Sequence, residues 1–130
     1  MILTTEERTK LIEEARQAFK THGLEPSKSH WYREGFCCFM SAIGLGRHAR
    51  EHGGLPQLDQ YGDAESYRDF ITKFVRPHFD REHFRYGIMD GWDGKAKAQQ
   101  DWYTAPRQRE YEEGYELGRD AWKAIGERPS

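Results

Sequence analysis

The chain has 130 residues and a formal net charge of −2, with 7 Phe, 7 Tyr, 4 Trp, 13 Gly and a single valine. The scarcity of branched aliphatic residues argues against a β-sandwich or a parallel sheet, and the near-neutral charge supplies no global field that would attract nucleic acid. We therefore expect an all-α fold, with about five helices around an aromatic and glycine-rich core, in a single domain over residues 1–130.

The two cysteines and the N-terminus indicate the cellular compartment of the protein. Cys37 and Cys38 are adjacent, and neighbouring cysteines rarely bridge each other, so we expect no disulfide framework. The first residues lack the regions of a signal peptide, and no apolar run is long enough to span a membrane. The sequence predicts a cytoplasmic protein without a membrane partner.

The first two helices are predicted from caps and apolar spacing. Thr4 and Glu7 have the spacing of a capping box, and Gly23 suits the end of the helix that follows. Ser29 is placed to cap a second helix that reaches about Ile43. That second segment is apolar around more than half its circumference, so we expect it to be the central helix, with residues 47–52 as a short polar continuation.

Three more helices are expected in the second half of the chain. Asp63 is placed to cap a third helix, and Pro77 either stops that helix or starts the next one. A fourth helix covers about residues 79–92. A fifth helix begins near Thr104 and ends at Gly126, with an apolar stripe that steps by four, three, four and three residues.

Glycines within the last two helices recur at helical spacing. Gly87 and Gly91 are four residues apart, and so are Gly114 and Gly118. Glycine inside a helix costs roughly 1 kcal/mol relative to alanine, so these positions need a reason. Such pairs allow another backbone to approach closely, and we expect aromatic rings to flank the crossing.

Three of these glycines, Gly87, Gly91 and Gly114, belong to an ordered set of residues between positions 84 and 118. The set comprises Gly87, Gly91, Gly94, Lys95, Lys97, Tyr103, Arg109, Gly114 and Tyr115. This order resembles ribosome modulation factor and its relatives, which are small bacterial and phage-borne proteins. The resemblance implies a helical hairpin over about residues 78–126, binding to the small ribosomal subunit and inhibition of translation. It also implies contacts from Lys95, Lys97, Tyr103 and Arg109.

Basic and aromatic residues near the start of the fifth helix form the predicted binding site. Bases of single-stranded RNA stack on rings while cations neutralise phosphates. The alternative is that the two rings pack into the core and the cations are merely solvated. Residues 84–130 hold eight basic and nine acidic residues, so RNA binding requires the cations to gather on one surface. The predicted contacts are Lys95, Lys97, Trp102, Tyr103, Arg107 and Arg109.

Neither catalysis nor a metal site is predicted. His48 and His52 share one helical face, but two histidines alone are fewer ligands than a structural zinc site uses. His78, Asp80 and His83 form a weaker candidate, because Pro77 disrupts their spacing. Cys37 and Cys38 fall in the apolar second helix, where thiols usually serve as packing. We expect no cofactor.

The sequence thus favours a non-catalytic protein that binds a nucleic-acid-handling machine and inhibits or modulates it. The expected partner is a large ribonucleoprotein or a host protein complex, with RNA as one contact, and the sequence leaves the oligomeric state open. The alternative is an anti-defence inhibitor of phage or mobile-element origin, of the anti-CRISPR type, which acts by protein–protein binding.

Overall fold

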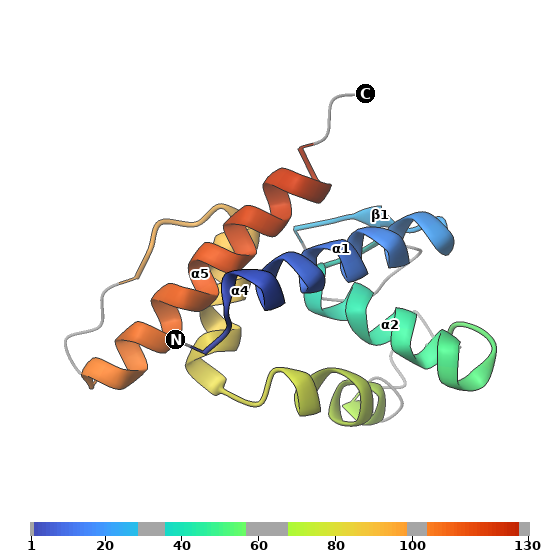
Figure 1. Cartoon of the computed structure of the whole chain (residues 1–130), viewed down its shortest axis with the longest axis horizontal. Helices are drawn as coiled ribbons and strands as arrows, with labels where there is room; N and C mark the ends of the chain where they lie inside the picture. Colours follow the sequence, from blue (N-terminus) through green and yellow to red (C-terminus); the bar gives the residue numbers. More distant parts are fainter. Residues whose placement is uncertain (1, 29–35, 57–67, 99–103, 128–130) are drawn as a thin grey trace. The chain divides into compact units, whose positions relative to one another are not determined.

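A computed structural model describes residues 2–28, 36–56, 68–98 and 104–127. The chain is mostly helical, which confirms the all-α prediction (Figure 1). It divides into two compact units, one formed by Met1–Ile12 with Phe79–Ser130 and the other by Glu13–His78. The single domain over residues 1–130 stays a prediction, and each unit is described by itself.

Helix α1 (Thr5–Thr21) begins and ends where the sequence predicts. The Thr4 hydroxyl accepts the amide hydrogen of Glu7, and the Glu7 carboxylate accepts that of Thr4, which completes the capping box. Gly23 follows the helix with a φ of 62°, a left-handed conformation that glycine adopts without steric cost. The first turns of α1 belong to one unit and the last turns to the other.

The Glu13–His78 unit differs from the prediction at the start of its second helix. Helix α2 (Phe39–His52) begins at Phe39 rather than near Ser29, and it continues through residues 47–52 as expected. Two-residue strands β1 (Glu25–Pro26) and β2 (Phe36–Cys37) pair in parallel before it, although no strand was expected. Phe36 and Cys37 are therefore not helical, while the predicted cap Ser29 lies outside the described residues.

A tightly packed helical segment follows α2 in the same unit. Residues 68–70 are α-helical, then come a π-helical turn η1 (Ile71–Val75) and a 3-10 turn η2 (Arg76–His78). Gly44 of α2 packs on this segment, because a Cβ there would lie 2.8 Å from Val75 Cγ2 and 3.0 Å from Phe70 Cζ. Asp63, the expected cap of the third helix, lies outside the described residues.

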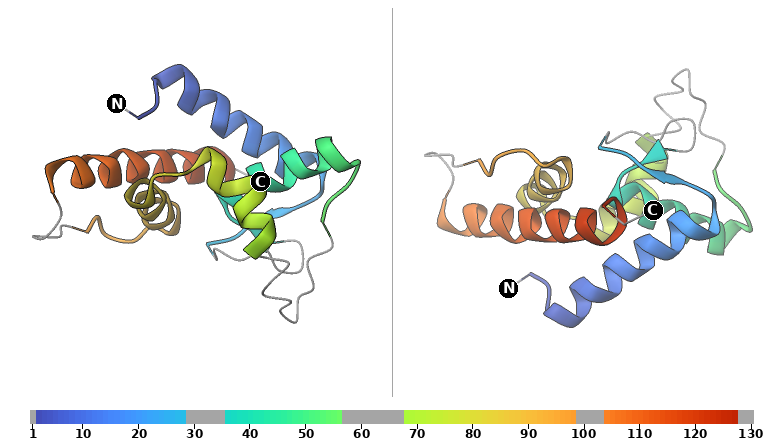
Figure 2. Two further views of the ribbon diagram at one scale, coloured as in Figure 1. Left: turned by 90° about the horizontal axis from the view of Figure 1, so that it is seen from below. Right: turned by 90° about the horizontal axis from the view of Figure 1, so that it is seen from above.

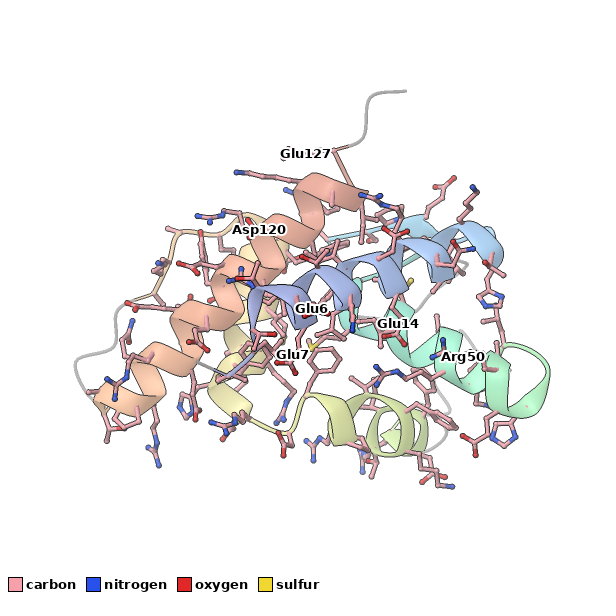
Figure 3. All side chains as sticks on the ribbon, viewed as in Figure 1. Glu6, Glu7, Glu14, Arg50, Asp120 and Glu127 are labelled. Atoms are coloured by element: carbon pink, nitrogen blue, oxygen red, sulfur yellow. The ribbon has the colours of Figure 1, made fainter. Side chains whose placement is uncertain are left out.

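An ion-pair cluster joins α1 to α2 within that unit. The Glu14 carboxylate accepts two hydrogen bonds from Arg47, at 2.8 and 3.0 Å, and a third from Arg50 at 2.9 Å (Figure 3). Burial raises the pKa of Glu14, but the hydrogen bonds from both arginines outweigh it, so the pKa lies below its ordinary value. The contact fixes the C-terminal half of α1 on α2.

In the other unit, α4 (Glu82–Asp93) and α5 (Ala105–Ile125) pack through their glycines. A Cβ on Gly87 would collide with the Tyr111 carbonyl oxygen, and one on Gly91 with that of Tyr115. The contacts are reciprocal, because Gly114 and Gly118 meet the backbone of α4 in the same way. This confirms the predicted close crossing of the two backbones.

The two helices run in the same general sense in Figure 1, and Figure 2 shows α4 nearly end-on. They are therefore not the antiparallel pair of a helical hairpin, which the resemblance implies. Advancing four residues along α4, from Gly87 to Gly91, moves the contact four residues along α5, from Tyr111 to Tyr115. The described start of the linker then runs back along α5. The Tyr115 hydroxyl donates to the Lys95 carbonyl, and three residues later the Ala98 amide donates to the Tyr111 hydroxyl.

Aromatic residues flank this crossing, as expected. Trp92 and Trp122 meet edge to face with ring centroids 5.0 Å apart. Tyr111 is buried, and its hydroxyl donates to Asp90 at 2.6 Å while it accepts the Ala98 amide hydrogen at 2.9 Å. Helix α4 begins at Glu82 rather than near residue 79, because Arg81 is extended, with φ −92° and ψ 114°.

Candidate functional site

A hollow of about 200 Å³ opens on the surface of the α4–α5 unit. It is bounded by the segment that precedes α1, by the N-cap of α4 and by the first half of α5. Its lining residues are Ile2, Arg81, Pro106, Arg109, Glu110 and Glu113. The hollow thus combines two guanidinium groups and two carboxylates with a small apolar surface.

Three of these polar groups are engaged by partners inside the unit. Arg81 forms an ion pair with Glu110 at 3.1 Å, which joins the start of α4 to α5. The Ile2 backbone N–H donates to Glu113 at 2.6 Å. A backbone group of the N-terminal segment therefore satisfies a carboxylate that faces the hollow.

The N-terminal segment is held on α5 by a second set of contacts. Arg8, two turns further along, donates to Asp120 at 3.1 Å and lies 3.6 Å from Glu116. Asp120 is labelled on α5 in Figure 3. Since Glu113, Glu116 and Asp120 recur at helical spacing, one acidic face of α5 receives the whole segment.

Arg109 differs from the other charged groups that line the hollow. Among the residues that the structure describes, its exposed side chain makes no hydrogen bond or ion pair. Glu113 stands four residues after Arg109, a spacing at which helical ion pairs form, but it accepts the Ile2 amide instead. Arg109 therefore lines a hollow in which two guanidinium groups are matched in charge by two carboxylates, Glu110 and Glu113.

The predicted linker lysines lie elsewhere on the unit. Both side chains are exposed, and the Lys97 ammonium stands 5.4 Å from the centroid of the Tyr115 ring. The backbone carbonyl of Lys95 accepts a hydrogen bond from the Tyr115 hydroxyl, so the Lys95 ammonium takes no part in this contact. The linker lysines are not among the residues that line the hollow with Arg109.

Arg107 is also exposed, and it acts electrostatically on the start of α4. The pKa of Glu82 is lowered chiefly by the hydrogen bond from the Tyr86 hydroxyl, with smaller contributions from nearby charges that include Arg107. The two predicted ring contacts, Trp102 and Tyr103, lie outside the described residues. All four predicted cations are thus exposed, but only Arg109 reaches the hollow.

Sequence reasoning missed the other residues of this site. The spacing of Arg109 and Glu113 is visible in the sequence, but it favours a pair between them rather than an unpaired arginine. The diversion of Glu113 to Ile2 joins positions 111 residues apart, and no local pattern reports such a contact. Arg81 carried no signal of a site, since the sequence prediction places it inside the fourth helix.

The candidate ligand and thiol residues of the other unit lie in structural contacts. His48 and His52 have ring centroids 4.5 Å apart and both pack on Phe74, while His48 Nδ1 lies 2.8 Å from the Gly54 carbonyl oxygen. No group of three or more ligand-type side chains that could hold a metal ion occurs in the described part of the chain.

Both thiols are buried, at the end of β2 and at the N-cap of α2 rather than within a helix. Burial, with a smaller contribution from Cys38, raises the pKa of the Cys37 thiol well above its usual range. The Cys38 sulfur lies 3.3 Å from the Ser41 hydroxyl.

Within the described ranges, no helix is both long and apolar enough to cross a bilayer. Comparison of the chain with protein-family models, with curated proteins and with solved structures gives no match.

Proposed function

We propose that this chain is a non-catalytic binding protein of the cytoplasm that inhibits or modulates a nucleic-acid-handling machine, with the ribosome as the first candidate. The order of residues between positions 84 and 118, which resembles ribosome modulation factor, supports this choice of partner. The exposed cations beside the linker would supply the contacts with RNA phosphates.

One observation carries the proposal. Acidic residues of α4 and α5 are engaged by internal partners, while the four predicted cations are exposed. The engaged acids are Asp90 with Tyr111, Glu110 with Arg81, Glu113 with Ile2, and Glu116 and Asp120 with Arg8. Three of these carboxylates are paired with arginines, whereas Asp90 and Glu113 accept from neutral donors and keep their charge. Part of the acidic charge is therefore offset internally while the four cations are exposed.

Ribosome co-sedimentation in sucrose gradients tests the proposal. We expect the wild-type protein to sediment with the small subunit at low salt and to be released as salt rises. A Lys95→Gln/Lys97→Gln/Arg109→Gln variant should bind at least about tenfold more weakly, because three phosphate contacts are lost. Lys123→Gln, which removes an exposed charge near the end of α5, is the matched control.

A protein-binding inhibitor is the second candidate, and one surface residue favours it. Tyr86 is the large hydrophobic residue that is exposed among those described, at 42%, and its hydroxyl donates to Glu82 at 2.6 Å. Exposed tyrosines often anchor protein interfaces. Wild-type protein that is absent from every ribosomal fraction, and that instead retains a CRISPR effector in a pull-down lost with Tyr86→Ala, would replace the first proposal by this one.

A further inference from the structure

We propose that His48 and His52 form a binding site for one divalent transition-metal ion, such as Zn²⁺ or Ni²⁺, at the C-terminal end of α2. Both residues belong to the Glu13–His78 unit, whereas the residues that carry the proposed function belong to the other unit. The metal site therefore stands or fails independently of the proposed function.

The order of residues at the end of α2 is typical of a helix that binds zinc. Residues 48–52 read His-Ala-Arg-Glu-His, which has the H-x-x-E-H form found in one class of zinc sites. Positions four residues apart lie on the same face of a helix, one turn from each other. Since residues 48–52 all lie within α2, the helix itself places both imidazoles on one face.

The two rings lie at the separation that a shared metal ion requires. Their centroids are 4.5 Å apart. With metal–nitrogen bonds of about 2.1 Å, two imidazoles on one ion have ring centres roughly 4.5–5 Å apart. The side chain of His52 is 52% exposed, so its ring can turn toward the ion without disturbing the core.

The hydrogen bond of His48 leaves one nitrogen of its ring for a metal. His48 Nδ1 lies 2.8 Å from the Gly54 carbonyl oxygen, which only accepts, so Nδ1 carries the hydrogen and Nε2 of the neutral ring keeps its lone pair. Histidines that bind metals commonly donate their second N–H to a carbonyl group, which fixes the ring. The Glu51 carboxylate, 3.8 Å from His52 Nε2, adds negative charge beside the second ring.

Phe74 of the π-helical turn η1 packs on both imidazoles. Its ring centroid lies 4.9 Å from that of His48 and 5.8 Å from that of His52. π-Helical turns are rare and occur frequently at functional sites. Phe74 gives the pair an apolar wall, and such a wall limits the access of water to a bound ion.

Two protein ligands leave the ion with open coordination positions. Within the described part of the chain no third ligand-type side chain joins the pair, so water fills these positions. The neighbouring cations Arg47 and Arg50 both bind the Glu14 carboxylate (Figure 3). Their charge is therefore partly compensated, which reduces their repulsion of a metal ion.

Calorimetric titration of the full, untagged chain with zinc chloride tests the site at about pH 7.5, where free imidazole is mostly neutral. We expect one ion per chain, and at least about tenfold weaker binding in His48→Gln and in His52→Gln. His22→Gln removes an imidazole just after α1 in the same unit, and this matched control should bind zinc as the wild type does. Circular dichroism shows whether each variant keeps its helices. Folded His48→Gln and His52→Gln proteins with wild-type affinity would overturn the site.

NMR of the imidazole nitrogens tests the site on the wild-type protein, so it does not depend on the folding of any variant. Zinc should shift or broaden the signal of His48 Nε2 and that of one ring nitrogen of His52 at the same stoichiometry. A response confined to other histidines, or no response, would overturn the proposal. Mg²⁺ prefers oxygen ligands and should move neither ring. An equal response to Mg²⁺ would also overturn the proposal, because it would indicate attraction by charge rather than coordination by imidazole.

Discussion

The carbonyl oxygen of Tyr115 on α5 occupies the position that a β-carbon on Gly91 of α4 would need. Because the obstacle is backbone, neither helix can relieve the clash by a change of side-chain rotamer. The small gain in helix propensity from alanine does not offset such overpacking.

We therefore expect Gly91→Ala to lower the free energy of unfolding by about 1–3 kcal/mol, measured by urea denaturation. Gly54→Ala is the control, because nothing lies within 4 Å of a Cβ added at Gly54. Equal denaturation midpoints for the two variants would show that the helices are not in close contact at Gly91.

The Tyr111 hydroxyl joins α5 to α4 and to the linker. Tyr111→Phe leaves the part-buried Ala98 amide without its acceptor, and we expect a loss of about 1–3 kcal/mol at pH 8. Lys123→Gln at the far end of α5 serves as the control and should change stability little.

Tyr111 also makes stability depend on alkaline pH. Burial, together with the hydrogen bond to Asp90, raises the pKa of Tyr111 to about 12. The unfolded tyrosine ionises near pH 10, so the folded state holds more protons between about pH 10 and 12, and stability falls as pH rises through this range. Tyr111→Phe should make this fall shallower in urea titrations at pH 8 and pH 11. A parallel fall in both proteins would contradict the assignment.

Glu14 is expected to stabilise the Glu13–His78 unit through its two arginines. Glu14→Gln should cost about 1–2 kcal/mol, whereas Glu13→Gln, at an exposed neighbour paired only with Arg16 at 3.3 Å, should cost little. Because the folded pKa of Glu14 is lowered, its contribution is present above the unfolded pKa and is lost as pH falls through the folded pKa. Denaturation at pH 7 and pH 3 should show a smaller acid loss in Glu14→Gln than in the wild type.

Arg8 should hold the N-terminal segment on the acidic face of α5. We expect Arg8→Ala to speed hydrogen exchange of the Ile2 amide and to lower stability by up to about 1 kcal/mol, since its ion pairs are partly exposed. Lys10→Ala removes a fully solvated pair with Glu6 and provides the comparison. Identical Ile2 exchange in the two variants would mean that Arg8 does not anchor the segment.

The sequence predicted those parts of the fold that local chemistry determines. The capping box at Thr4, the end of α1 at Gly23 and both ends of α5 follow from residues within one turn of each boundary. The glycine faces of α4 and α5 were also predictable. Each glycine inside a helix lowers the stability of that helix, and therefore indicates that another backbone lies close to it.

The start of α2 was not predictable from the same reasoning. Residues 36–40 form a short apolar run, and periodicity alone does not distinguish a buried strand from a buried helix over so few residues. The pairing of Phe36 with Glu25 depends on a tertiary contact that the sequence pattern does not show. The relative direction of α4 and α5 could not be predicted either, because the same glycine spacing allows parallel and antiparallel packing.

For the candidate site, the sequence identified the cations but not their environment. The sequence indicated Arg109 because of its place in the order of residues that resembles ribosome modulation factor. The structure adds that Arg109 lines the hollow and that Glu113 accepts the Ile2 amide hydrogen. Lys95 and Lys97 are exposed as the RNA hypothesis requires, but they belong to a separate surface next to Tyr115.

The docking of Ile2 on α5 also has a consequence for folding. Its hydrogen bond closes a separation of 111 residues, and the contact of Arg8 with Asp120 closes one of 112. Loop-closure entropy grows with such separations, so contacts within the nearby α4–α5 pair should form earlier than these.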